Sequence, residues 1–390
     1  MGNAASAISP SQQIDDDWAK VGLNSLRFAF ALVVVLAHLS QPLFQTSWPD
    51  LTRYALMAVG GFFVLSGYTI KAVTPSPEGF DVVAFLIDRA SRLLSVSLFA
   101  LVLTMAADTA SAWLAPAFYA DHFGASLSEP LIRIFANVFL VSQLYGQDIA
   151  PFSNSPFWSL SYEAGFYVIW AALMHWRLGG GSVVWLLAAV VFYGPNVLFM
   201  LPFWLLGTVL FQLGRLKPWP RTLLSLGVMA LVLLFMGLRF TAAGAHGMDL
   251  MDESLKGAIE SFFSSLGISA GRVRISIILA AVKIFLLLIP VLHLADRVSR
   301  KYAVPALLAK VARRLRDVTF PLYLVHFPLL VLASSGKWFN PRSGLEICIL
   351  VMVLLIAANV VATVADSFKF WMRGSLRHAL LKGRAAAPSV

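Results

Sequence analysis

Two ionisable residues, Arg27 and His38, lie in the first long apolar stretch of the chain with ten residues between them. Eleven helical steps of about 100° return to within about 20° of the starting direction, so both side chains face one side, roughly 16 Å apart along the axis. An imidazole can take a proton from a hydroxyl, and a guanidinium can bind an anion. Because ionisable groups in a membrane-spanning stretch face away from lipid, we predict a shared polar cavity. The alternative is a snorkelling Arg27 and a packing His38.

Glu163 lies near the start of another apolar stretch, and its carboxylate would lie at the same depth in the membrane as His38. His38 and Glu163 each lie about six residues, or ~9 Å, from the same expected membrane face. A carboxylate beside an imidazole fixes its tautomer and raises its basicity. We therefore predict that Glu163 orients His38 as a proton acceptor. The alternative is a protonated Glu163, or one that bonds nearby backbone.

Arg89 and Arg92 are three residues apart at the start of the third apolar stretch, so they share a helical face. Together with Arg27 they would form a cationic cluster near the opposite membrane face. Arginine forks match the geometry of phosphate groups, which predicts an anion-binding mouth. The alternative is the ordinary excess of basic residues at the inner membrane surface, with lipid headgroup contacts.

Three further polar residues lie within apolar stretches. Ser66 and Tyr68 belong to the glycine-rich segment 60–68, in which small residues allow two helices to approach closely. Ser66 would either contact a ligand or bond its own helix. His326 lies two residues before Pro328, and it would either line the same cavity as His38 or satisfy a neighbour beside the proline kink.

The composition requires that these groups be held by membrane helices. The chain has 390 residues, of which 59% are hydrophobic and 13% charged, with a mean hydropathy of +0.78. Soluble domains have about 25% charged residues, which excludes an ordinary soluble, disordered or fibrous protein. Cys348 is the single cysteine, so an intrachain disulfide and a cysteine zinc cluster are excluded. The net charge of +10 is spread over short loops, so we expect no nucleic-acid partner.

The fold class predicted is an all-α, polytopic helical bundle with about ten transmembrane helices. The apolar stretches are 21–44, 52–73, 89–107, 157–175, 182–194, 196–213, 222–239, 275–295, 318–334 and 345–367. Gly194-Pro195 would make the fifth and sixth a tight hairpin. A further stretch, 131–145, is interpreted as re-entrant or interfacial because it carries three polar residues. The resulting regions are a polar cytoplasmic tail at 1–20, a transmembrane domain at 21–367 and a basic cytoplasmic tail at 368–390.

The positions of the basic residues support this topology. With both termini cytoplasmic, 21 of the 30 lysines and arginines fall on the inner side, 8 on the outer side and one within a span. This bias follows the positive-inside rule. Two outer loops, about 108–156 and 240–274, are long enough to be functional, or they form a solvated cap.

The motifs together resemble a known family. Arg27 and His38 with ten residues between them, the segment 63–68, Arg89 with Arg92, Trp158-Ser159-Leu160 before Glu163, and Tyr323-Leu324-Val325-His326 occur in the order seen in membrane-bound acyltransferase family 3. The resemblance covers about residues 20–367. Two departures are Leu93-Leu94-Ser95, where the third motif usually continues to a proline, and Thr319-Phe320-Pro321, where the last motif often begins with Ser-Tyr.

This resemblance implies an O-acyltransferase, most often an O-acetyltransferase, that moves an acyl group from cytoplasmic acyl-CoA to a hydroxyl of an exported or cell-envelope saccharide. It implies catalytic His38 and Glu163, and acyl-CoA binding by Arg27, Arg89 and Arg92. The cavity-lining residues it implies are Ser66, Tyr68, Trp158, Ser161, Tyr323 and His326. We expect acetyl-CoA as donor, no metal, contacts with membrane lipid and with glycan synthesis or export proteins, and a bacterial inner membrane location.

Two other functions fit the same residues. A proton-coupled transporter or glycan exporter would also place His, Glu and Arg inside a ten-helix bundle. Transporters often contain internal repeats, and none is visible in this sequence. A non-catalytic partner in a glycan-export assembly would keep glycan acylation normal when His38 is replaced.

Overall fold

The computed structural model describes residues 17–46, 48–74, 80–124, 129–177, 182–216, 218–239, 242–265 and 272–385. Every regular element within these ranges is a helix, which confirms the predicted all-α class. Most of the predicted tail at 1–20, namely 1–16, and the end of the second tail, 386–390, lie outside the described residues.

The helices fall into long and short elements. The long ones are α2 (Trp18–Leu39), α3 (Thr52–Val73), α4 (Val82–Leu114), α7 (Trp158–Arg177), α8 (Val183–Leu213), α9 (Pro218–Arg239), α10 (Ala242–Ser265), α11 (Arg272–Ser299), α12 (Ala306–Ser335) and α13 (Gly344–Ala385). The short ones are η1 (Pro42–Phe44), α5 (Pro116–Phe123), α6 (Pro130–Val138), η4 (Leu144–Gly146) and η5 (Ser155–Phe157).

Seven of the described helices, α2, α3, α4, α8, α11, α12 and α13, are long and apolar enough to cross a membrane. Every stretch predicted to span lies largely within a helix of the structure. One of the seven, α8, contains two of the ten predicted spans. Two further predicted spans lie in α7 and α9, which are not among the seven. The chain is therefore an integral membrane protein with a polytopic helical bundle.

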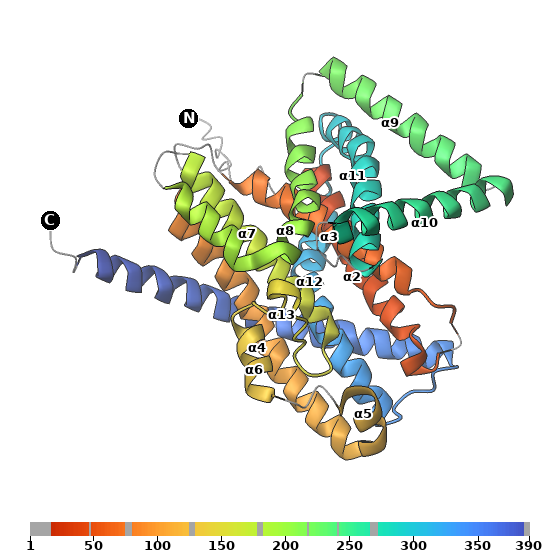
Figure 1. Cartoon of the computed structure of the whole chain (residues 1–390), viewed down its shortest axis with the longest axis vertical. Helices are drawn as coiled ribbons and strands as arrows, with labels where there is room; N and C mark the ends of the chain where they lie inside the picture. The colour runs from red at the N-terminus through yellow and green to blue at the C-terminus, as the bar shows by residue number, and fades with distance from the viewer. Residues whose placement is uncertain are drawn as a thin grey trace, which may run out of the picture.

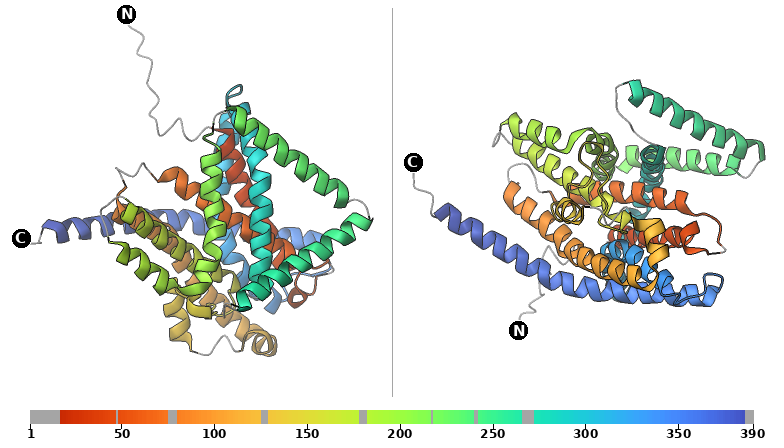
Figure 2. Two further views of the ribbon diagram at one scale, coloured as in Figure 1. Left: turned by 45° about the horizontal axis from the view of Figure 1, so that its top comes forward. Right: turned by 60° about the horizontal axis from the view of Figure 1, so that its bottom comes forward.

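Two central helices organise the bundle (Figures 1 and 2). α3 packs against α2, α8 and α11, and α12 packs against α2, α4 and α13. α2 is thus held between the two central helices, which places Arg27 and His38 in the interior. α9 and α10 lie beside α11. α10 runs from the end of α9 toward the start of α11 (Figure 1).

The predicted hairpin at Gly194-Pro195 is one continuous element in the structure, α8, with a break at this point. Gly194 has φ of 69°, a left-handed conformation that glycine adopts without a steric penalty. Pro195 has no N–H for the helical ladder, so the break costs little hydrogen bonding. The two halves of α8 consequently run in different directions (Figure 1).

The glycine-rich face of α3 makes the closest helix contact. A Cβ atom on Gly67 would lie 1.9 Å from the Trp204 carbonyl oxygen, and one on Gly207 would lie 2.0 Å from the Val64 carbonyl oxygen. Only glycine fits at these two positions, as predicted for small-residue packing. This approach of α3 to α8 also brings Ser66 against the indole of Trp204.

The two predicted outer loops contain more helix than expected. Residues 242–265 of the region 240–274 form α10. The helix α4 extends to Leu114, so Asp108 lies in a helix and is 3% exposed rather than solvated. Ser153 satisfies this carboxylate from its backbone N–H at 2.8 Å and its hydroxyl at 2.6 Å. The stretch 131–145 contains the nine-residue α6, which is too short to cross a membrane.

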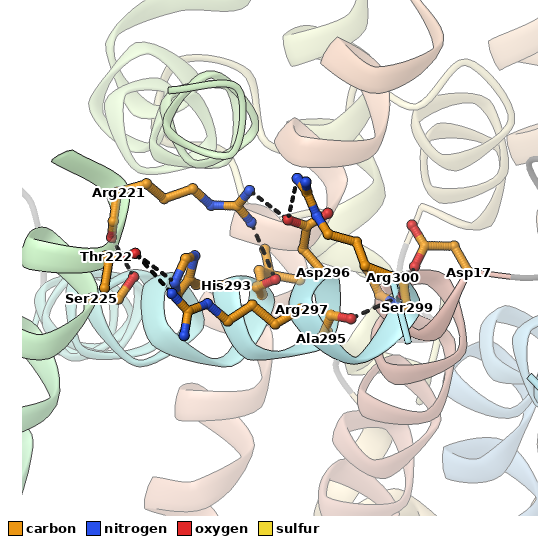
Figure 3. A network of polar contacts seen from close by, with 12 residues as sticks. Asp17, Arg221, Thr222, Ser225, His293, Ala295, Asp296, Arg297, Ser299 and Arg300 are labelled. Atoms are coloured by element: carbon orange, nitrogen blue, oxygen red, sulfur yellow. Dashed lines mark hydrogen bonds and ion pairs between the residues drawn. The ribbon is translucent and has the colours of Figure 1, made fainter. Parts of the chain in front are cut away.

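A polar network joins α9, α11 and the start of α2 at the arginine-rich end of the bundle (Figure 3). Asp296 accepts hydrogen bonds from Arg221 at 3.0 Å and from Arg300 at 3.2 Å, and Ser299 donates to Asp17. Asp17 also caps α2 by accepting from the Ala19 N–H. These contacts fix the first turn of α2, the helix that carries Arg27 and His38.

Candidate active site

A small cavity of about 100 Å³ lies between α2, α3, α4, α7 and α12. It is lined by six of the eleven residues that the sequence singled out: Arg27, Ser66, Arg89, Arg92, Glu163 and Tyr323. Aromatic and aliphatic side chains, among them Phe62 and Leu160, also form part of its wall. The arrangement suits a molecule with an anionic group at one end and an apolar or weakly polar group at the other.

A larger vestibule of about 500 Å³ adjoins this cavity. Its basic lining residues are Lys20, Arg27, Arg89, Arg92, Arg313, Arg316, Lys369 and Arg373, and its acidic ones are Asp88, Asp317 and Asp366. Six residues line both spaces: Arg27, Thr69, Arg89, Arg92, Arg316 and Phe320. The predicted cationic mouth is therefore present, and it forms the boundary between the vestibule and the cavity. Tyr68 lines the vestibule rather than the cavity.

Arg27 is fixed to α3 by hydrogen bonds. Its Nη2 donates to the Leu65 carbonyl oxygen at 2.8 Å and to the Thr69 hydroxyl, which itself donates to the same carbonyl at 2.8 Å. The guanidinium is half-buried at the boundary of the two spaces. It therefore offers its remaining N–H donors from a fixed position, as recognition of a phosphate or carbonyl oxygen requires.

Glu163 is bound by residues other than His38. Its Oε1 accepts a hydrogen bond from the Ser66 hydroxyl at 3.1 Å and one from the Tyr167 hydroxyl, while Trp204 Nε1 donates to Ser66 Oγ at 3.1 Å. The hydrogen bonds of the described residues include none between Glu163 and His38, so the predicted pair does not form. Equal depth along two helices did not place the two groups on facing surfaces.

His38 is paired with the other predicted histidine. The ring centroids of His38 and His326 are 5.2 Å apart, and His38 also packs at 5.0 Å on Phe327. The Gln41 amide nitrogen lies 3.1 Å from Nδ1 of His38. An amide nitrogen only donates, so Nδ1 accepts and the proton of neutral His38 is on Nε2.

His326 lies entirely inside the bundle, with 0% of its surface exposed. Its Nδ1 donates to the Leu322 carbonyl oxygen at 3.0 Å. The other ring nitrogen, Nε2, is buried and has no hydrogen-bond partner in the part of the chain that the structure describes. The pair of histidines therefore contains one unused proton acceptor.

Tyr323 separates the cavity from the two histidines. It lines the cavity, its ring packs on Phe62 at 5.7 Å, and its centroid lies 6.4 Å from that of His326. Its hydroxyl is 3.0 Å from the Ser159 hydroxyl, which fixes the ring in this position. His38 and His326 line neither the cavity nor the vestibule, in contrast to the prediction that His38 faces the same space as Arg27.

Two of the predicted cavity residues, Ser161 and Trp158, contact other protein groups and do not line the cavity. Ser161 is fully buried and its hydroxyl accepts from the Gln143 backbone N–H at 3.2 Å. Trp158 packs edge-on against Tyr162 and Phe63, with centroids 5.3 and 6.4 Å away. Neither residue lines the cavity, because each lies on a different face of α7 from Glu163.

Pro328 explains how α12 presents its histidine. A proline removes the N–H that would bond the carbonyl four residues earlier, here that of Leu324. Asn154 replaces this donor: its Nδ2 lies 2.8 Å from the Leu324 carbonyl oxygen and 2.8 Å from Thr104 Oγ1. The loop before α7 thereby stabilises the kinked turn of α12 that carries His326.

Sequence reasoning missed five polar lining residues: Thr69, Ser159, Tyr167, Arg316 and Thr319. Helical periodicity could have identified them. Ser159 and Tyr167 lie four residues on either side of Glu163, and Thr69 lies three residues after Ser66. Arg316 and Thr319 lie seven and four residues before Tyr323, so each of the five shares a helix face with a residue already identified.

Comparison with known proteins adds the family. No curated protein and no solved structure shows significant similarity to the chain. A family model described as an acyltransferase domain matches residues 20–365, a range that includes every residue that lines the cavity. The chain belongs to the acyltransferase 3 family of membrane proteins.

Proposed function

We propose that this membrane acyltransferase is an O-acyltransferase that moves an acyl group, in the simplest case acetyl, from acyl-CoA to a saccharide hydroxyl. The observation that carries the proposal is the arginine boundary shared by the vestibule and the cavity. It offers cations where the phosphates of CoA would bind, and a narrower space beyond them for the acyl end.

The donor would enter from the arginine-rich end, which the charge bias of the sequence places in the cytoplasm. Eight basic and three acidic side chains line the vestibule, so its net charge favours the polyanionic nucleotide part of CoA. Arg27, Arg89, Arg92 and Arg316 would hold the phosphates or the thioester carbonyl at the entrance to the cavity. Glu163, close to these arginines, would act as their counter-ion rather than as the partner of His38.

His38 would act as the general base on the acceptor hydroxyl. The acceptor would displace the Gln41 amide from Nδ1, the lone pair of the neutral ring. Its oxygen would then bond to the thioester carbonyl carbon as its proton moves to Nδ1. The C–S bond would break, and the CoA thiolate would leave and take up the proton from Nδ1, which restores neutral His38. Because Tyr323 stands between the cavity and His38, transfer requires its ring to move.

A saccharide acceptor would come from the end of α2 that carries Gln41, opposite the donor. This proposal suits an exported or cell-envelope glycan in a bacterial inner membrane, made or exported by other proteins. The two substrates would then approach from opposite ends of α2.

The test uses membranes from cells that express the protein, supplied with acetyl-CoA labelled in its acetyl group. O-acetyl esters on saccharides are released by mild alkali, so alkali-labile label in the saccharide fraction measures the reaction. His38→Ala should lower this incorporation by about 10²- to 10⁴-fold, the usual contribution of a general base, at equal protein level. Wild-type membranes without incorporation above the empty-vector control would reject the function, and full activity of His38→Ala would reject the base.

A further inference from the structure

The Nε2 nitrogen of His326 is one of several buried side-chain polar atoms without a hydrogen-bond partner in the described part of the chain, and it belongs to a fully buried ring. A buried polar atom without a hydrogen bond costs about 1–3 kcal/mol, and such atoms are uncommon in folded proteins. His326 is 0% exposed, and its ring lies against His38 of α2 and near Tyr323 and Phe327 of its own helix. A cost of this size calls for a compensating role.

The hydrogen bonds of the two rings define which nitrogens carry protons. His326 donates from Nδ1 to a carbonyl oxygen, so its Nε2 is a lone pair. His38 accepts at Nδ1 from Gln41, so its Nε2 carries a proton. At a centroid separation of 5.2 Å, small rotations of the two side chains bring a ring nitrogen of one to hydrogen-bond distance of the other.

We propose that His326 is the positioning residue of His38: its Nε2 accepts the Nε2 proton of His38 and stabilises the imidazolium that forms when His38 takes the proton of the acceptor hydroxyl. His326 thus has the role that the sequence assigned to Glu163. The inference rests on the proposed acyl transfer, in which His38 is the base.

The anchoring of His326 supports this role. Its ring is fixed by the Leu322 carbonyl, and the turn that carries it is held by Asn154 across the kink at Pro328. Phe327 packs on the His38 ring at 5.0 Å, and His326 is fully buried. In a buried environment a hydrogen bond to a charged ring is stronger than it would be in water.

Two amide substitutions distinguish the role of Nε2 of His326 from that of Nδ1. The amide of glutamine reaches the position of Nε2 and retains an acceptor there, while that of asparagine reaches the position of Nδ1 and retains only the donor to Leu322. We expect His326→Asn to lower kcat for labelled acetyl-CoA by about 10- to 100-fold, the effect of one hydrogen bond to a charged group. His326→Gln should remain much closer to wild type, and KM for acetyl-CoA should stay unchanged in both variants.

His293 supplies a matched control. Its Nδ1 is also buried without a partner among the described residues, but it lies on α11 in the network of Figure 3, apart from the cavity. His293→Asn and His293→Gln should leave kcat equal to each other and near the wild-type value. A comparable difference between the two His293 variants would overturn the assignment of the effect to the His38 pair.

A double substitution tests whether His326 acts through His38. In the His38→Ala background, His326→Asn should cause no further loss of the residual rate. An additional tenfold loss, a more active Asn than Gln variant, or absence of both proteins from the membrane would each assign His326 to the structure of α12 and overturn the proposal. A wild-type protein that incorporates no label would instead reject the proposed function itself.

Discussion

The arginine boundary and the histidine pair lie at two ends of the same helix, α2, and they differ in how their polar groups are satisfied. Arg27 is bonded to Leu65 and Thr69, and Glu163 to Ser66 and Tyr167, next to open space. His38 and His326 lie against each other outside both cavities, with one nitrogen unbonded. Fixed, partnered charges suit the binding of a ligand, whereas an unused acceptor on a buried ring suits the movement of a proton.

After His38→Ala, the largest kinetic effect that distinguishes the two regions should come from Arg27. Arg27→Ala removes donors at the boundary of the vestibule and the cavity, so KM for acetyl-CoA should rise by about 10- to 100-fold, the value of a charged hydrogen bond. Arg27→Lys keeps the charge without the fork and should recover part of the affinity. Steady-state kinetics with labelled acetyl-CoA measures both, and an unchanged donor KM in Arg27→Ala would show that the boundary does not bind the donor.

The next effect concerns the support of the histidine pair. Asn154→Ala leaves the Leu324 carbonyl oxygen without a donor, which should reduce stability by about 1–3 kcal/mol and lower kcat without changing donor KM. Asn137→Ala is the control, because Asn137 donates in the same way to the carbonyl oxygens of Arg133 and Ile149, neither of which belongs to α12. Thermal unfolding in detergent should shift for both variants, while kcat should fall only for Asn154→Ala; equal kcat losses would contradict the link to His326.

A smaller effect is expected for Glu163. Glu163→Gln keeps an acceptor for Ser66 and Tyr167 but removes the negative charge. We expect kcat to fall by less than about tenfold, because a neutral hydrogen bond or a solvent-screened ion pair contributes only about 1 kcal/mol. A carboxylate that oriented the catalytic imidazole would give a fall of about 10⁴ when changed to the amide. Measured kcat therefore decides between the contact seen in the structure and the pairing predicted from sequence depth.

The smallest effect should come from Ser161. Its hydroxyl serves the Gln143 backbone and not the cavity, so Ser161→Ala should change kcat and donor KM by less than about twofold, since a single neutral hydrogen bond contributes roughly 1 kcal/mol to folding and nothing directly to transfer. The parallel substitution Ser159→Ala removes a hydroxyl that does line the cavity and contacts Tyr323, and it provides the comparison. A larger kinetic change in Ser161→Ala than in Ser159→Ala would contradict the structure, because it would mean that the face of α7 at the cavity carries Ser161 rather than Ser159.

The features that identify the family could be predicted from the sequence, because they depend on composition and local spacing. Apolar stretches of spanning length predicted the helices, and the three-residue spacing of Arg89 and Arg92 predicted a shared face at the cavity. The sequence could not predict that Glu163 and His38 fail to pair, because depth along an axis does not fix the rotation of a helix about that axis. Gly67 and Gly207 set this rotation for α3 and α8 through backbone contacts that belong to no single segment.

The sequence by itself determined a polytopic helical membrane protein, its arginine boundary and its set of candidate residues, since hydrophobicity and helical periodicity are properties of each segment alone. Tertiary structure decided that His38 meets His326 rather than Glu163, that Tyr323 closes the cavity and that Asn154 completes the kink at Pro328. These outcomes follow from how separate helices rotate and approach one another, and that is fixed by packing between segments distant in the chain.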